Sequence, residues 1–290
     1  MNKADIARSF SLAAGTYDKH AFVQQEIANR LLERLDYLKK KPRLILDVGA
    51  GTGQHTRALQ QKFPESTVIG IDIAQGMAQF AKSKQSWQFW KNAPQYLCAD
   101  AESLPFGKNS VDLIFSNFTL QWCADLELVF TEFKRIVKPN GMIFFSTLGP
   151  NTLHELKTSF ATVDNNSHVN EFVDMHDIGD YLLNCHFGDP VIDMEMITIH
   201  YPNVKSLLID LKGTGAHNMS PLRLKGCLSK QQYLRMVAAY ETLKQQNGLI
   251  PASYEVVYGH AWQQQPSHLY PEDSEGVVRI PADKIPRLVL

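Results

Sequence analysis

Apolar residues fall into two alternating patterns over the first half of the chain. Short continuous apolar runs predict buried parallel strands, because a strand covered on both faces has no polar side. Apolar residues three and four positions apart predict amphipathic helices between those runs. The strands are expected at residues 43–50, 67–73, 96–100, 111–118 and 138–148, and the helices at residues 53–62, from residue 76 onward and at residues 127–137. This alternation predicts an α/β fold with a doubly wound, mostly parallel sheet.

The pattern changes on either side of this region. Apolar residues at helical spacing between residues 5 and 40 predict an N-terminal helix that follows a looser start and ends before Pro42. Strict alternation of apolar and polar residues predicts a sixth strand at residues 191–201 and a seventh at residues 253–262. The remaining helices are expected at residues 151–162, 174–184, 203–216 and 229–246. We therefore expect one enlarged α/β domain over residues 1–262 and a loosely ordered tail over residues 263–290.

The first predicted strand runs into a glycine-rich loop, "LDVGAGTGQHT". A Walker loop needs Gly-Lys-Ser/Thr after its glycines, whereas Gln54 and His55 follow Gly53 here. A dinucleotide-binding loop has the spacing G-x-G-x-x-G, whereas Gly49, Gly51 and Gly53 give G-x-G-x-G. The loop is therefore a weak match to either kind of nucleotide site.

Aspartates end the first three predicted strands. Asp47 is placed to meet an ammonium group or to organise the loop, and Asp72 is placed to accept both hydroxyls of a ribose. Asp100 is placed to accept from an exocyclic amine. A ligand with an ammonium group, a ribose and an adenine but no phosphate would use all three, and S-adenosylmethionine is such a ligand. Each aspartate alone could be a helix N-cap, but three in this order after the loop favour the ligand.

Composition and charge exclude several classes of protein. The chain has 290 residues, of which 44% are hydrophobic and 20% charged, with a net charge of −1, so nothing global indicates binding to nucleic acid or membrane. No apolar run approaches the roughly 20 residues of a membrane-spanning helix, and the first residues lack the apolar core of a signal peptide. The four cysteines are far apart, so we expect reduced thiols, a cytoplasmic location and no metal site.

Five segments in order resemble class I S-adenosylmethionine-dependent methyltransferases: "LDVGAGTG", "IGIDIAQGM", "CADAESLPF", "VDLIFSN" and "RIVKPNGMIFFST". The resemblance implies a seven-stranded Rossmann-like sheet, helical lid and insertion elements, and S-adenosylmethionine as cofactor with S-adenosylhomocysteine as product. It implies that Asp72 binds the ribose, that Asp100 and Ala101 contact the adenine, and that Ile73 and Met77 form the walls of the adenine slot. The expected cofactor residues are Asp47, Gly49, Gly51, Gly53, Asp72, Ile73, Met77, Asp100, Ala101 and Asn117.

Other segments are not generic cofactor motifs, and together they resemble the malonyl-[acyl-carrier-protein] O-methyltransferase family of biotin synthesis. They are residues 10–35, "SNFTLQWCADL", "STLGPNTLHELKTSF", "VDNNSHVNEF" and "LKGTGAHN". The resemblance implies methylation of the free carboxylate of a malonyl thioester, giving a methyl ester that fatty-acid enzymes elongate to pimeloyl. It also implies an N-terminal lid over residues 1–40, a cofactor-binding core over residues 43–148 and a helical substrate insertion at about residues 203–250.

The residues agree with this chemistry. A carboxylate is already ionised at pH 7, so no general base is required, and the sequence shows no Ser-His-Asp arrangement. The main polar need is a cation or donors for the malonyl group, for which Arg223 is the first candidate, followed by His168 and His217. The resemblance implies that Tyr17 faces the active site, although an aromatic staple for the helix is an equal alternative. Trp122 is expected either to line the pocket or to pack under the lid.

The segment over residues 205–235 has six basic residues and a single acidic one, in a chain of net charge −1. An acidic acyl carrier protein would be attracted to such a patch, although a solvated helical face is the alternative. Three other functions stay open: a complex I assembly factor that acts on a protein arginine, a non-catalytic cofactor-binding module, and a methyltransferase for a small phenol or quinone. The segments "LQWCADL" and "LKGTGA" favour the malonyl acceptor.

Overall fold

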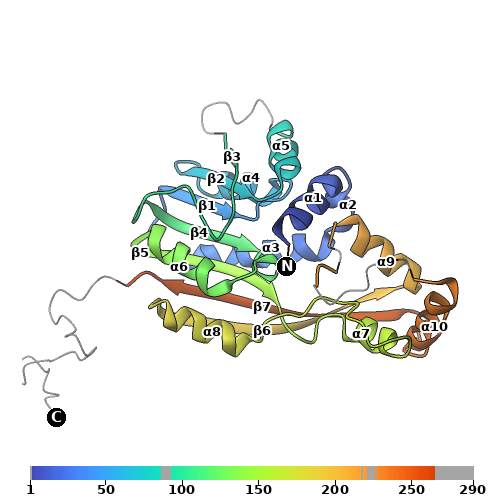
Figure 1. Cartoon of the computed structure of the whole chain (residues 1–290). Coiled ribbons are helices and arrows are strands. Elements are labelled where there is room, and N and C mark those ends of the chain that lie inside the picture. Colours follow the sequence, from blue (N-terminus) through green and yellow to red (C-terminus); the bar gives the residue numbers. More distant parts are fainter. Residues whose placement is uncertain (1, 86–92, 217, 221–225, 227, 265–290) are drawn as a thin grey trace, which may run out of the picture.

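The computed structural model describes residues 2–85, 93–216, 218–220, 226 and 228–264. Within these residues, seven strands form one sheet in the order β3-β2-β1-β4-β5-β7-β6 (Figure 1). The strands are β1 Leu44–Val48, β2 Thr67–Asp72, β3 Gln95–Cys98, β4 Val111–Asn117, β5 Val137–Leu148, β6 Gly188–Tyr201 and β7 Ile250–Trp262. The first five are parallel to one another, and β7 runs antiparallel between β5 and β6. The predicted seven-stranded Rossmann-like sheet is confirmed.

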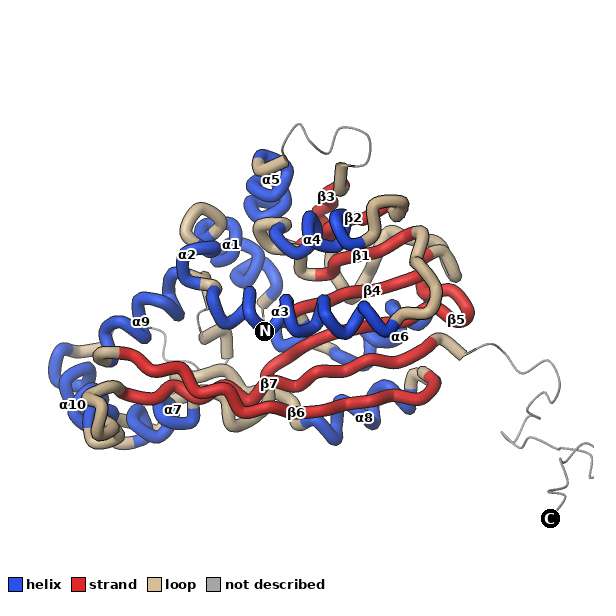
Figure 2. Tube along the Cα trace, turned by 180° about the vertical axis from the view of Figure 1, so that it is seen from behind, coloured by secondary structure: helices blue, strands red, loops and turns tan. Residues whose placement is uncertain are grey.

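Helices cover both faces of this sheet. Those of the described residues are α1 Lys3–Ala13, α2 Tyr17–His20, α3 Phe22–Arg34, α4 Gln54–Lys62, α5 Gln75–Ser83, α6 Leu126–Ile136, α7 His154–Ala161, α8 Met175–Asn184, α9 Val204–Gly213 and α10 Lys230–Glu241. Figure 2 shows α3 and α4 over one face, and Figure 1 shows α6 and α8 over the other. No helix of the described chain is both long enough and apolar enough to span a bilayer.

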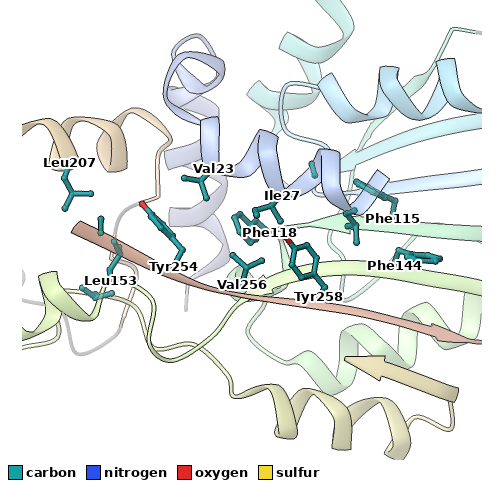
Figure 3. Packing of buried hydrophobic residues seen from close by; sticks show 14 of the residues in the cluster. Val23, Ile27, Phe115, Phe118, Phe144, Leu153, Leu207, Tyr254, Val256 and Tyr258 are labelled. Carbon is teal, nitrogen blue, oxygen red and sulfur yellow. The ribbon is translucent and has the colours of Figure 1, made fainter. Parts of the chain in front are cut away.

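Neighbouring residues of β5 build the two halves of the core, because successive side chains of a strand point to opposite faces. On one face, Phe144 belongs to a buried cluster that also contains Ile27 of α3 and Tyr258 of β7 (Figure 3). Phe145 packs on the other face against Phe130 of α6, with ring centroids 5.5 Å apart. The core therefore fixes the sheet from both sides and leaves the ends of its strands for a ligand.

The N-terminal segment differs from the expected helix with a looser start. The first residues already form α1, because the Asn2 side chain accepts a hydrogen bond from the backbone N–H of Ala4 and caps the helix. α1 then lies against α5, where Gly76 has no side chain in the way: a Cβ at this position would lie 2.8 Å from Cα of Ser11. The expectation of a loose start is wrong, because Asn2 caps a helix that already begins at Lys3.

The antiparallel pair of strands β6 and β7 extends beyond the rest of the sheet. β7 pairs with β5 only over Val256–Trp262, whereas its pairing with β6 continues to Ile250. The projecting end carries α9 and α10, which lie between β6 and β7 in the sequence (Figure 1). Because β6 ends at the same edge as the parallel strands, the predicted insertion lies beyond the carboxyl edge of the sheet, where doubly wound folds bind ligands.

Two predicted helices are shorter than expected. α9 ends at Gly213 rather than residue 216, and α10 ends at Glu241 rather than residue 246. Gly215 directly follows the C-cap of α9 with a φ angle of 73°, a conformation that glycine adopts easily and that stops a helix. Most of the tail predicted to be loosely ordered, residues 265–290, lies outside the described residues.

Candidate active site

A long pocket lies at the carboxyl ends of β1, β2 and β4. Helices α1, α2 and α9 and the loop at residues 168–172 contribute the opposite wall. Of the residues expected from the sequence, the pocket is lined by Tyr17, Gly49, Gly51, Asp72, Ile73, Met77, Asp100, Ala101, Asn117 and His168. Asp47 lines a smaller neighbouring cavity, and Gly53 lines neither. Arg223 and His217 lie outside the described residues.

The glycine loop has a backbone shape that only glycine tolerates at its first position. Gly49 has a φ angle of 80°, and a Cβ there would lie 1.8 Å from Oγ1 of Thr119. Gly53 has a different role from the cofactor contact that the motif implies. A Cβ there would lie 2.5 Å from the Tyr96 hydroxyl, so this glycine lets α4 begin close to β3.

Asp72 holds a fixed carboxylate at the end of β2. Its Oδ2 accepts a hydrogen bond from the N–H of Gly51 at 2.8 Å, and its Oδ1 accepts from the N–H of Ala74 at 2.8 Å. Burial raises the pKa of this carboxyl to about 6, and the two N–H groups oppose that shift. Ile73 and Met77 line the pocket beside it. The arrangement fits a ribose whose hydroxyls donate to a pre-positioned acceptor.

The end of the pocket where the adenine is expected contains an ion pair that the sequence did not predict. Nζ of Lys3 lies 2.6 Å from Oδ2 of Asp100 and 2.5 Å from Oε2 of Glu102, and all three residues line the pocket. Lys3 belongs to α1, so this pair connects the N-terminal helix to the loop after β3. Local sequence carries no signal for this contact, since it depends on how α1 packs.

Tyr17 and Trp122 lie between the N-terminal helices and the strand ends. Tyr17 lines both cavities, and burial together with the nearby carboxylates of Asp72 and Asp18 raises the pKa of its hydroxyl, which keeps its proton at neutral pH. Trp122 lines the pocket and also packs edge-to-face on Phe10 of α1, with ring centroids 5.1 Å apart. Both roles predicted for Trp122 are therefore present: it lines the pocket, and it packs against the N-terminal helix α1.

The smaller cavity adjoins the glycine loop. It shares Gly49 and Gly51 with the main pocket and contains Asp47, whose carboxylate accepts a hydrogen bond from the Thr56 hydroxyl at 2.5 Å. Burial raises the pKa of Asp47 to about 7. His55 also lines this cavity, and its buried Nε2 has no hydrogen-bond partner among the described residues. A polar cavity with an unpaired nitrogen fits the amino-acid end of S-adenosylmethionine.

The other end of the main pocket is largely apolar and is expected to take the acceptor. Two histidine–carboxylate pairs interrupt it, neither predicted from the sequence. Nδ1 of His20 lies 2.7 Å from Oδ1 of Asp210, and Nε2 of His168 lies 2.8 Å from Oδ1 of Asp164. The His168 ring also stacks on Phe160 at a centroid distance of 4.0 Å.

The glycines of the "LKGTGA" segment explain how α9 reaches the N-terminal helices. A Cβ at Gly213 would lie 2.3 Å from the His20 ring, so α2 approaches α9 only because this position lacks a side chain. The Ser9 hydroxyl of α1 donates a hydrogen bond to the carbonyl of Gly215 at 2.9 Å. The segment therefore joins α9 to the N-terminal helices α1 and α2 along one side of the pocket.

Solved structures share this architecture. The YcgJ protein from Bacillus subtilis matches with a TM-score of 0.58 at 16% identity, over 81% of this chain and 98% of that one. Haemonchus contortus phosphoethanolamine N-methyltransferase 2 in complex with S-adenosyl-L-methionine matches with a TM-score of 0.55 at 17% identity, over 88% of this chain and 57% of that one. Residues 46–145 match the family model described as a methyltransferase domain.

Curated relatives are far more similar in sequence. The chain is 46% identical to the malonyl-[acyl-carrier protein] O-methyltransferase of Gallionella capsiferriformans, over 92% of each chain. It is 42% identical to malonyl-[acyl-carrier protein] O-methyltransferase 1 of Coxiella burnetii, over 97% of this chain and 95% of that one. The fold and the pocket define a class I S-adenosylmethionine-dependent methyltransferase. Within that class, the chain belongs to the malonyl-[acyl-carrier protein] O-methyltransferase family.

Proposed function

We propose that the protein transfers a methyl group from S-adenosylmethionine to the free carboxylate of a malonyl group carried by an acyl carrier protein. The product is the malonyl methyl ester that primes pimeloyl formation. One observation carries the proposal: a single pocket runs from the glycine loop and the strand-end acids to an acceptor end formed by the segments that distinguish this family. Membership of the malonyl-[acyl-carrier protein] O-methyltransferase family supports the same acceptor.

The reaction requires the protein mainly to align the acceptor carboxylate with the methyl group. Bound S-adenosylmethionine supplies a methyl group on a positively charged sulfur. An acceptor carboxylate oxygen forms the new bond to the methyl carbon while the carbon–sulfur bond breaks, so no proton moves. The residues around the pocket need only hold the two groups in line and exclude water, which α1, α2 and α9 do from one side. Among the described residues, no cluster of three metal-binding side chains is present.

The acceptor carboxylate needs a cation or hydrogen-bond donors. Arg223, His168 and His217 remain the candidates from the sequence, and of these His168 lies in the acceptor end of the described pocket. Tyr17 is the candidate nearest the cofactor end, where its protonated hydroxyl could donate to a reacting oxygen. These assignments stay proposals.

A methyl-transfer assay tests the function against its alternatives. The protein is incubated with methyl-labelled S-adenosylmethionine and a malonyl carrier protein, a protein substrate rich in arginine, or a small phenol. We expect label only in the malonyl carrier, as a methyl ester that base hydrolyses. Label on the phenol, or an arginine product, would replace the proposed function with one of the alternatives.

We also propose that the basic segment docks an acidic carrier protein. Lys205, Lys212 and Lys230 are exposed on or beside α9 and α10, at the acceptor end of the molecule. Reversing these three charges to glutamate should raise the KM for malonyl carrier protein and change kcat little, because long-range attraction mainly governs association. This rise in KM relative to the wild type should be smaller in 1 M salt, where the Debye length is about 3 Å.

The control is charge reversal at residues 39–41, three exposed lysines before β1 that change the net charge equally. This control variant and a small malonyl thioester should both give wild-type kinetics. An equal rise in KM for the control, or for the small thioester with the docking variant, would show that the segment has no docking role.

A further inference from the structure

We propose that His20 binds the free carboxylate of the acceptor and that Asp210 is the positioning residue that holds its ring. The inference rests on the proposed malonyl acceptor and assigns a residue that recognises its negative charge. His20 lies on α2 and Asp210 on α9, and both line the pocket. Their side chains are 25% and 28% exposed, so the pair is largely removed from solvent.

The pairing decides which nitrogen meets a ligand. Nδ1 of His20 lies 2.7 Å from Oδ1 of Asp210, so Nε2 is the ring nitrogen left for a ligand. With Nδ1 bound to Asp210, an N–H at Nε2 would be free to donate a hydrogen bond to a ligand in the pocket. A charge-assisted hydrogen bond of this kind suits a second carboxylate, which an acetyl group lacks.

Asp210 is itself held in place. Its carboxylate interacts with the hydroxyl of Tyr201, which in turn interacts with the hydroxyl of Tyr254. Both tyrosines are buried and line the pocket. The network joins α2 and α9 to the ends of β6 and β7, so the His20 ring is fixed before the acceptor arrives.

His20 lies in the part of the pocket where methyl transfer to the acceptor is expected. It lies three residues after Tyr17 on α2, which places both side chains on the same side of the chain. Tyr17 borders the cofactor end of the pocket, so His20 lies between that end and the acceptor end. Lys3, another basic residue of the pocket, is already bound to two carboxylates at the adenine end.

The test compares two thioesters that differ only in the carboxylate. The KM for malonyl-pantetheine and the inhibition constant of acetyl-pantetheine are measured for His20→Phe and for Asp210→Asn. His20→Phe should raise the malonyl KM about 10- to 100-fold, the usual range for a lost bond to a charged group, and leave acetyl inhibition unchanged. Asp210→Asn should act in the same direction by a smaller factor. The control is His176→Phe, which removes a similar histidine from an exposed pair with Asp174 outside the pocket.

Equal weakening of both thioesters would overturn the proposal and make His20 a contact between the two lid elements only. Unchanged malonyl kinetics in His20→Phe would overturn it as well. If the wild-type protein methylates no malonyl thioester, the proposed function itself fails, and that result is distinct from either outcome.

We also infer, from an independent observation, that His55 binds the amino-acid end of the cofactor. The acidic side chains of the smaller cavity have partners: Asp47 is bound by Thr56, and Asp18 by Thr52 at 2.6 Å. In contrast, Nε2 of His55 is buried and unpaired among the described residues. A buried polar atom left unpaired is costly, so a bound group is expected to satisfy it.

The order of the subsites identifies that group. Asp100 marks the adenine, and Asp72 marks the ribose and is bonded to Gly51. Continuing along the ligand past Gly51 leads into the smaller cavity, which shares this glycine. The ammonium and carboxylate of the cofactor would lie there, and a neutral imidazole nitrogen can accept from the first or donate to the second.

Two ligands distinguish the loss of one binding contact from a general loss of folded protein. S-adenosylhomocysteine contains the amino-acid group, whereas 5′-methylthioadenosine lacks it. Calorimetry of His55→Phe should show S-adenosylhomocysteine binding weakened about 10- to 100-fold and 5′-methylthioadenosine binding unchanged. His55→Gln, which keeps a polar terminus, should recover part of the loss. Equal weakening of both ligands, or of neither, would overturn the inference, while failure of the wild-type protein to bind S-adenosylhomocysteine would overturn the cofactor assignment.

Discussion

Replacing Gly49 with alanine should strongly weaken cofactor binding and destabilise the protein. The new Cβ would lie 1.8 Å from Oγ1 of Thr119, whose hydroxyl donates to the carbonyl of Val48 beneath the loop. Overpacking costs about 1–3 kcal/mol, and a left-handed φ adds about 1–2 kcal/mol for a residue with a Cβ. We therefore expect the free energy of unfolding to fall by about 2–5 kcal/mol.

The effect on the cofactor follows from the same displacement. The N–H groups of Gly49 and Ala50 both donate to the carbonyl of Ile71, at 2.7 Å and 2.9 Å, so a shift at Gly49 pulls the loop away from β2. The N–H of Gly51 would then lose its bond to Asp72, which loosens the ribose acceptor. Affinity for S-adenosylhomocysteine should fall on the order of 100-fold, about 2.7 kcal/mol.

Denaturant unfolding and calorimetry measure both effects. Gly107→Ala is the matched control, because nothing lies within 4 Å of a Cβ there and its φ angle is not positive. The control should retain wild-type stability and affinity. Wild-type affinity in Gly49→Ala would show that the loop does not form the cofactor site.

The second large effect concerns the acceptor. A malonyl thioester offers a carboxylate that is ionised at neutral pH, whereas an acetyl thioester offers only a carbonyl and a methyl group. Methylating the acetyl group would require removal of a carbon-bound proton, and no base is needed for the carboxylate. Because only the malonyl group offers an ionised oxygen that can attack the methyl carbon without losing a proton, we expect the difference to be all or none.

The cofactor end could be predicted from sequence because it depends on local rules. Parallel strands bring their carboxyl ends to one edge, so Asp72 and Asp100 were expected beside the glycine loop, and both line the pocket. Gly53 shows the limit of this reasoning, because the motif does not reveal that its neighbours are Tyr96 and Ala81. That role depends on how α4 packs against β3 and α5.

The acceptor end could not be predicted in the same way. The Ser9 hydroxyl meets the Gly215 carbonyl across 206 residues of sequence, and His20 meets Asp210 across 190. Such pairs depend on the packing of the N-terminal helices against α9, which the glycines at positions 213 and 215 allow. The family resemblance correctly marked these segments as informative, but only the fold shows which side chains they bring together.

The most direct measurement of the proposed function compares methyl transfer to malonyl and acetyl groups on the same acyl carrier protein. Each carrier is incubated with the protein and methyl-labelled S-adenosylmethionine, and base-labile label is counted on the carrier. We expect labelled methyl ester on the malonyl carrier and no label above background on the acetyl carrier. Equal labelling of the two carriers, or an unlabelled malonyl carrier under conditions where the cofactor binds, would contradict methylation of the malonyl carboxylate.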